Sequence, residues 1–159
     1  MIHPDPEKLL EDQGAQILLR LLLWGEARGE RDAGGDLDAR GMLGVAWVAM
    51  NRSKDRSMTL PEVILQPWQF SCFNANDPNR ASMLKAHELE PVAWSRADAV
   101  ADLVEASLTI DPTKGASHYV VEALWGRSGT AKWFGKIEID AGRTVELARI
   151  GHHVFARAA

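Results

Sequence analysis

Two glutamates four residues apart, Glu26 and Glu30, are the side chains in this sequence best suited to acid–base chemistry. They close the segment Trp-Gly-Glu-Ala-Arg-Gly-Glu after an apolar run, and a helix would place both on one face. A glutamate in such a position can be partly removed from water, which keeps its carboxyl protonated until it meets a leaving group. An ordinary solvated helix end has the same composition, so spacing alone leaves both interpretations open.

A second candidate segment spans residues 66–71 and reads Gln-Pro-Trp-Gln-Phe-Ser. It combines two aromatic rings with amides and a hydroxyl, a mixture that suits stacking on and hydrogen bonding to a sugar ring. Aromatic residues beside proline also fill core gaps under loops, which is the alternative. Four tryptophans lie near predicted loops, namely Trp24, Trp68, Trp125 and Trp133. Trp47 lies within an apolar helix and is expected in the core.

Histidine and cysteine offer other chemistries. His118, His152 and His153 could join Glu26 in a zinc amidase, but adjacent histidines point in different directions and no His-Glu-x-x-His spacing is present. The single cysteine, Cys72, cannot form an internal disulfide; we expect a small buried apolar residue, and a Cys–His nucleophile pair is the alternative. The sequence therefore predicts no metal site, and no residue pattern implies a cofactor.

Helices are expected to position these residues. Apolar side chains repeat near the helical period over residues 7–28, and a polar loop follows at 31–41. Residues 42–51 are apolar on every side, which predicts a central helix that is packed all round. Thr59 with Glu62 predicts a capping box at the start of a short helix. Ser95 to Asp98 repeats the same pattern ahead of a further helix.

The pattern changes after Gly115, where short β-branched or aromatic segments are separated by glycine. These segments are residues 117–121, 137–139 and 153–155. They predict extended arms or a small hairpin in the C-terminal third. The expected fold class is therefore mainly α (α+β), as one domain over residues 1–159, with residues 1–8 expected to be disordered.

Composition narrows the possible partners. The chain has 159 residues and a formal net charge of −4, with basic residues scattered singly, so nucleic acid is not expected as a partner. The most apolar stretch, residues 17–24, is interrupted by Arg20 and is far shorter than the ~20 residues that cross a bilayer. The acidic, proline-containing N-terminus does not resemble a secretory signal. We expect a monomer made in the cytosol.

Four segments together, residues 18–30, 44–52, 66–71 and 115–119, resemble the SleB-type cell wall hydrolases. This family includes spore-cortex-lytic enzymes and phage endolysins, and the resemblance runs from about residue 17 to residue 155. It implies a lysozyme-like helical fold with a groove for a glycan strand of peptidoglycan. The loop at 31–41 is longer than the family's usual spacer, and Trp24 stands where a smaller or phenolic residue is expected.

The resemblance also implies catalytic and substrate-binding roles for individual residues. Glu26 occupies the place of the family's catalytic acid, and Glu30 is the second choice. The residues expected to bind substrate are Trp24, Gln69, Phe70, Ser71, His118, Tyr119 and Trp133.

A single strong acid candidate favours a lytic transglycosylase, in which the muramic acid 6-hydroxyl attacks its own anomeric carbon and forms a 1,6-anhydro sugar. The first alternative is a hydrolytic muramidase, in which Glu30, Asp32, Asp36 or Asp38 holds a water. The second is a catalytically silent glycan-binding or virion-structural protein. Without a signal, the chain is expected to be a phage endolysin that a holin releases to the periplasm or cell wall.

Overall fold

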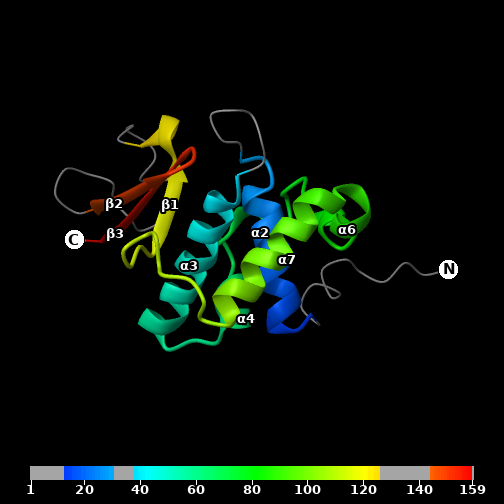
Figure 1. The fold of residues 1–159 in the computed structure, drawn as a ribbon, viewed down its shortest axis with the longest axis horizontal. Helices are drawn as coiled ribbons and strands as arrows, with labels where there is room; N and C mark the ends of the chain where they lie inside the picture. Colours follow the sequence, from blue (N-terminus) through cyan, green and yellow to red (C-terminus); the bar gives the residue numbers. More distant parts are fainter. Residues whose placement is uncertain (1–12, 31–37, 126–143, 159) are drawn as a thin grey trace.

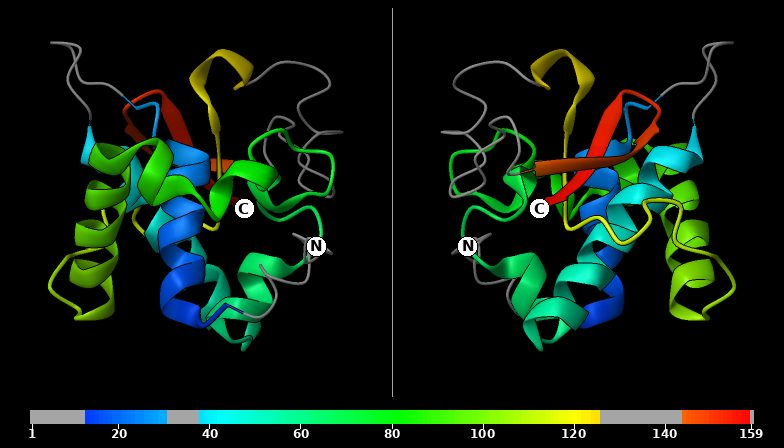
Figure 2. Two further views of the ribbon diagram at one scale, coloured as in Figure 1. Left: turned by 90° about the vertical axis from the view of Figure 1, so that its right-hand side faces the viewer. Right: turned by 90° about the vertical axis from the view of Figure 1, so that its left-hand side faces the viewer.

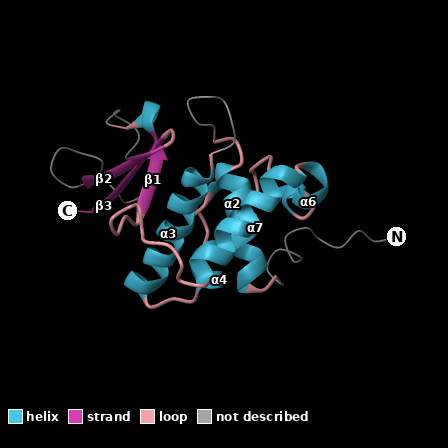
Figure 3. Ribbon diagram, in the orientation of Figure 1, coloured by secondary structure: helices cyan, strands magenta, loops and turns pink. Residues whose placement is uncertain are grey.

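The apolar runs in the first two-thirds of the chain form helices that share one core. The computed structural model describes residues 13–30, 38–125 and 144–158. The helices are α2 (Ala15–Ala27), α3 (Ala39–Arg56), α4 (Leu60–Leu65), α5 (Arg80–Met83), α6 (Ala86–Leu89) and α7 (Pro91–Glu105), with 3-10 helices η1 (Ser71–Phe73) and η2 (Glu122–Leu124). The strands are β1 (His118–Val121), β2 (Thr144–Ile150) and β3 (His153–Ala158). Helices and strands occupy opposite sides of the molecule, which confirms the expected mainly helical α+β class (Figure 3).

Helix α2 forms the centre of the core. It begins after Gly14 and ends at Ala27, close to the predicted end, whereas the predicted residues 7–12 lie outside the described part. Its large buried apolar side chains are Leu18, Leu19, Leu21, Leu22, Leu23 and Trp24. Arg20 on α2 pairs with Asp98, Asp102 and Glu105 of α7, which lies along one side of α2 (Figure 2).

Helix α3 lies between the sheet and the pair formed by α2 and α7 (Figure 1). It confirms the predicted central helix but is longer at both ends, because Asp38 caps its start and Ser57 ends it in a left-handed conformation at φ 53°. Gly44 is the point of closest approach to the sheet, since a Cβ atom there would overlap the Phe155 ring. Val48, Ala116 and Phe155 form the small core between α3 and the strands.

Substituting Gly44 with alanine is expected to destabilise the fold. Alanine favours helix over glycine by roughly 0.5–1 kcal/mol, but overpacking against the buried Phe155 ring costs about 1–3 kcal/mol. Chemical denaturation should therefore show a net loss of stability. The control is Gly29→Ala, where no atom lies within 4 Å of the added Cβ; equal stabilities of the two variants would contradict the packing described.

Of the two predicted helix starts, the one at Thr59 is confirmed and the one at Ser95 is not. The capping box is confirmed, because Glu62 Oε2 accepts from the Thr59 backbone N–H at 2.7 Å and Thr59 Oγ1 accepts from the Glu62 N–H at 3.4 Å. The predicted start at Ser95 is wrong, since α7 already begins at Pro91. Proline lacks the N–H that a first helical residue leaves unpaired, and its φ is preset for a helix.

The three strands form an antiparallel sheet in the order β1-β3-β2. The predicted segments 117–121 and 153–155 correspond to β1 and β3, which places Tyr119 opposite Phe155. Strand β2 was not predicted, and the predicted segment 137–139 lies outside the described residues. Because β3 is central, it pairs with both other strands, while Asn51 and Arg52 of α3 donate to the carbonyls of Ala116 and Ser117 just before β1.

Candidate active site

Glu26 lies on the last turn of α2, where its half-buried carboxylate accepts three hydrogen bonds. Ser71 Oγ donates to Oε1 at 3.1 Å, and the Cys72 N–H donates to the same oxygen at 2.9 Å. The Tyr119 hydroxyl donates to Oε2 at 2.6 Å. One carboxyl group is thus held jointly by α2, η1 and β1.

Gly25 allows η1 to approach α2 closely. A Cβ atom at this position would lie 2.7 Å from both Cβ and Sγ of Cys72, well inside van der Waals contact. The side chains of Phe70 and Cys72 anchor η1 in the core, where they are 2% and 1% exposed. The glycine before Glu26 is therefore what lets a backbone N–H of η1 reach the carboxylate.

The groups around Glu26 are neutral donors. Burial raises the pKa of the Tyr119 hydroxyl well above its usual value, and the nearby Glu26 charge raises it further. Burial and the Glu26 charge raise the pKa of the Cys72 thiol in the same way. Both groups therefore keep their protons at neutral pH, and the Tyr119 hydroxyl remains a hydrogen-bond donor to Glu26.

Arg52 forms hydrogen bonds with two segments of the site, one before η1 and one before β1. Its guanidinium is buried and donates to the Ser117 carbonyl at 2.6 Å and to the Gln69 carbonyl at 3.0 Å. It also lies over the Phe70 ring, 4.7 Å from the centroid. Burial, with a smaller contribution from Arg56, lowers the pKa of Arg52 to about 10, so the group is still cationic at neutral pH.

Glu30 occupies a closed site next to the sheet. Its carboxylate is 5% exposed, pairs with His153 Nδ1 at 2.5 Å and accepts from the His152 N–H at 3.3 Å. Gly41 and Gly151 face it, and a Cβ atom on either would overlap the Glu30 side chain. The second-choice catalytic residue is thus enclosed by protein, where a glycan strand has no access.

The pair formed by Glu30 and His153 nevertheless supports Glu26 indirectly. The His153 ring meets the Tyr119 ring edge-on, with centroids 5.3 Å apart and planes at 82°. The Tyr119 hydroxyl in turn holds Glu26. A continuous series of contacts therefore leads from the buried Glu30 and His153 side chains to Glu26.

A comparison with protein families decides what kind of protein carries this site. The family model described as Cell Wall Hydrolase matches residues 37–156. The chain belongs to the cell wall hydrolase family. It is therefore a peptidoglycan-cleaving enzyme, and peptidoglycan is its substrate. The matched range begins after Glu26, so the choice of catalytic residue rests on the site geometry and on the motif that contains it.

Two solved structures share the fold of this cell wall hydrolase. The catalytic domain of the Bacillus cereus SleB protein is 22% identical with a TM-score of 0.57, over 90% of this chain and 89% of that one. The catalytic domain of the germination-specific lytic transglycosylase SleB from Bacillus anthracis is 20% identical with a TM-score of 0.58, over 92% of this chain and 96% of that one. No curated protein sequence matches this chain significantly.

Two of the residues predicted to bind substrate, Ser71 and Tyr119, donate hydrogen bonds to Glu26. Gln69 instead accepts from Arg52 and Arg56, and His118 forms a hydrogen bond with Ser117 Oγ. Ser71 is exposed and the other three are partly buried. Cys72 is buried, as predicted. Sequence reasoning gave no role to Arg52, and its position inside the resemblance segment 44–52 was the available signal. The segment 66–71 was predicted to offer an aromatic surface to a sugar, and its Trp68 is 77% exposed.

Two predicted substrate contacts need correction. Trp24 is 1% exposed and Phe70 is 2% exposed, so neither side chain can touch a glycan in this structure. Both rings pack in the main core, because Trp24 belongs to the buried run of α2 and Phe70 anchors η1. Trp133 lies outside the described residues.

Within residues 13–30, 38–125 and 144–158, no group of three His, Cys, Asp or Glu side chains is placed to hold a metal ion. In the same parts of the chain, no helix is long and apolar enough to cross a membrane.

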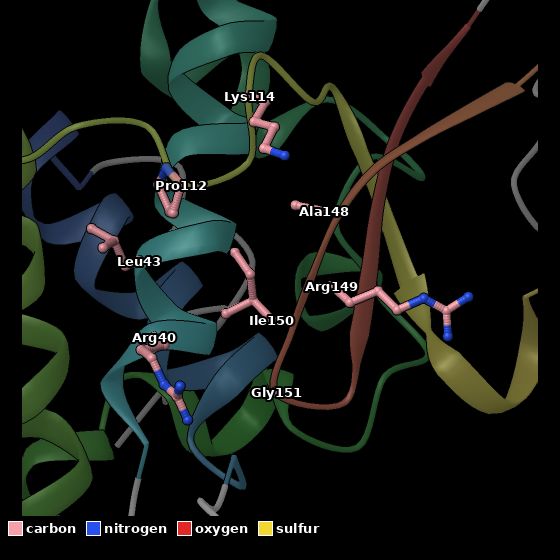
Figure 4. A pocket seen from close by; sticks show the side chains of 8 residues that line it. All are labelled: Arg40, Leu43, Pro112, Lys114, Ala148, Arg149, Ile150 and Gly151. Atoms are coloured by element: carbon pink, nitrogen blue, oxygen red, sulfur yellow. The ribbon is translucent and has the colours of Figure 1, made fainter.

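One surface hollow of about 410 Å³ lies between α3 and β2 (Figure 4), and Glu26 is not among the residues that line it. Its residues include Lys114, Arg40 and Arg149. The last two are already paired with carboxylates, Arg40 with Asp38 and Arg149 with Glu146.

His118 gives the site a pH-dependent stability. Burial, together with Arg52 and Arg56, lowers the pKa of His118 from 6.5 to about 3. The unfolded chain therefore binds this proton first as the pH falls, so the folded state loses stability between pH 6.5 and pH 3. In His118→Asn, whose amide can still form a hydrogen bond with Ser117 Oγ, the melting temperature should fall less steeply over this range. Parallel curves of melting temperature against pH for the two proteins would contradict the lowered pKa of His118.

Proposed function

We propose that this cell wall hydrolase is a lytic transglycosylase that cleaves the β-1,4 bond between N-acetylmuramic acid and N-acetylglucosamine. The observation that carries the proposal is the environment of Glu26. Its partners are two hydroxyls and a backbone N–H, and no carboxylate bonds to it among the residues that the structure describes. One acid is enough when the nucleophile belongs to the substrate. One of the similar structures is described as a lytic transglycosylase.

The reaction uses Glu26 twice. The protonated carboxyl first donates its proton to the glycosidic oxygen, and the bond from this oxygen to C1 of muramic acid breaks. The resulting carboxylate then takes the proton of the muramic 6-hydroxyl, whose oxygen forms a bond to C1. The products are a 1,6-anhydromuramic end and a free hydroxyl on N-acetylglucosamine, and Glu26 regains its proton.

The hydrogen-bond donors assist the first step. Negative charge develops on Glu26 as its proton leaves, and preorganised donors stabilise such charge without reorganisation. Tyr119 and the Cys72 N–H are fixed by the sheet and by η1, whereas the Ser71 hydroxyl is exposed and can rotate. The carboxylate therefore reaches solvent on the side of Ser71, which is where the proposal places the glycan.

The geometry supports this reaction over the muramidase alternative. Two of the carboxylates proposed to hold a water are already engaged: Glu30 by His153, and Asp38, 8% exposed, by Arg40. Asp32 and Asp36 lie outside the described residues. The endolysin role, holin dependence and site of action remain predictions.

Trp68 is proposed as a stacking surface for a sugar ring. It lies three residues before Ser71, and its backbone is held at φ 66°, unusual for a bulky residue, while its N–H donates to Asn74 Oδ1 at 3.2 Å. Trp68→Ala should raise KM for glycan chains about fivefold, in line with an aromatic contact of roughly 1 kcal/mol, with kcat nearly unchanged. Trp68→Phe is the control that keeps the stacking; an unchanged KM in the alanine variant would exclude this role.

The proposed reaction is tested by digesting purified sacculi in water enriched in oxygen-18. A transglycosylase forms 1,6-anhydro ends that contain no oxygen from water, so the muropeptides should lack the label. Reducing muramic ends that carry the label would instead establish hydrolysis and overturn the proposal.

A further inference from the structure

Arg56 is an exposed arginine at the edge of the site. It is the last residue of α3, which ends there because Ser57 adopts a left-handed conformation. Its Nη1 donates to Gln66 Oε1 at 3.0 Å and to Gln69 Oε1 at 2.7 Å. Two side chains from the loop before η1 therefore orient one edge of the guanidinium.

The partners of Arg56 leave its charge uncompensated. Both glutamines are neutral, and in the described parts of the chain no carboxylate lies within 4.0 Å of the Arg56 guanidinium. Other arginines have carboxylate partners, as in the pairs of Arg20 with Asp98, Arg28 with Glu90, Arg40 with Asp38 and Arg149 with Glu146. Arg56 thus differs from these four arginines in being oriented by neutral side chains, and unlike the buried Arg52 it is exposed, so its charge stays available to a ligand.

Arg56 belongs to the same surface as Glu26. Gln69 accepts from Arg56 through its side chain and from Arg52 through its backbone carbonyl. Two residues later, Ser71 donates to Glu26. The charge of Arg56 also lowers the pKa of His118, the neighbour of Tyr119 in β1.

We infer that Arg56 binds a carboxylate on the substituent at O3 of the muramic acid whose glycosidic bond is cleaved at Glu26. This inference rests on the proposed function and names the part of the substrate that the site recognises. The planar fork of an arginine matches a carboxylate in two parallel hydrogen bonds. In peptidoglycan the O3 substituent is either a free lactyl acid or a lactyl group extended by a stem peptide, and both carry carboxylates. O3 and C1 belong to one ring, so this contact orients the bond to be broken.

The test compares wild type with Arg56→Gln on three soluble glycan preparations. The first keeps its stem peptides, the second has been stripped by an amidase to the free lactyl acid, and the third is the stripped glycan with its carboxylates converted to methylamides. On a preparation that carries the carboxylate recognised by Arg56, we expect Arg56→Gln to lower kcat/KM about tenfold, as for the loss of a charge-assisted hydrogen bond. On the methylamide preparation the two proteins should be equal.

The first two preparations distinguish the source of the carboxylate. A loss on the stem-bearing glycan alone assigns a stem-peptide carboxylate, and a loss on the stripped glycan assigns the lactyl acid. Lys54→Gln removes the same charge from an exposed position on the last turn of α3 and should behave as wild type on every substrate.

Equal activity of Arg56→Gln and wild type on all three glycans would overturn the inference. A loss of the same size on the methylamide glycan would also overturn it, because it would indicate a structural role. The products of the same digests report on the proposed function separately: reducing ends would refute the transglycosylase while the substrate discrimination by Arg56 could still be measured.

Discussion

Glu26→Gln is expected to lower the release of soluble muropeptides from sacculi by about 10³-fold, within the range that a general acid contributes. The amide cannot donate a proton to the glycosidic oxygen or accept one from the muramic 6-hydroxyl. It keeps the shape of the carboxyl, and its oxygen can still accept from Ser71 and the Cys72 N–H. A dye-release assay on labelled sacculi measures the rate.

Folding and glycan binding serve as internal controls for this prediction. The melting temperature and the amount of protein that sediments with sacculi should both be close to wild type. Glu88→Gln, an exposed position on α6 with only a 3.6 Å contact to His87, should retain full activity. A Glu26→Gln protein with activity within tenfold of wild type would exclude Glu26 as the acid.

Glu30→Ala is expected to lower the free energy of unfolding by about 3–5 kcal/mol, more than Gly44→Ala does. The reason is that the substitution leaves His153 without its partner in a buried site. Burial raises the pKa of Glu30, but the hydrogen bond and charge of His153 and the His152 N–H bring it below its usual value. A lowered pKa means that this stabilisation is complete above about pH 4.5 and is lost as the pH falls below it. Urea denaturation of wild type and Glu30→Ala should therefore show a smaller difference in the free energy of unfolding at pH 3.5 than at pH 7.

This prediction also separates a structural from a catalytic role for Glu30. Glu30→Gln retains an acceptor for the His152 N–H but loses the charge, so it should be less destabilised than Glu30→Ala. At a temperature where it is folded, it should keep most of its activity. A Glu30→Ala protein with wild-type stability and no activity would favour the muramidase alternative, in which Glu30 holds a water.

The sequence predicted those parts of the fold that depend on local patterns. The capping box at Thr59 and Glu62 needs only two residues and a helix start, and the apolar run at 42–51 is recognisable in any context. Strand β2 was missed because its segment, Thr-Val-Glu-Leu-Ala-Arg-Ile, also fits an amphipathic helix and becomes a strand only by pairing with β3.

The candidate site shows the same division. The motif around Glu26 was informative because its residues are consecutive, and Ser71 and Tyr119 fell within recognised segments. The burial of Trp24 was not predictable, since it depends on which elements surround the last turn of α2. The contact of Glu30 with His153 joins residues that are far apart in the sequence, so it becomes evident only once the sheet is formed.

The central claim is that Glu26 transfers both protons in a reaction that closes a 1,6-anhydro ring. Mass spectrometry of muropeptides released from purified sacculi by wild type and by Glu26→Gln tests it most directly. We predict fragments ending in 1,6-anhydromuramic acid from wild type and almost none from the variant. Reducing muramic ends from wild type, or anhydro ends released equally by both proteins, would contradict the claim.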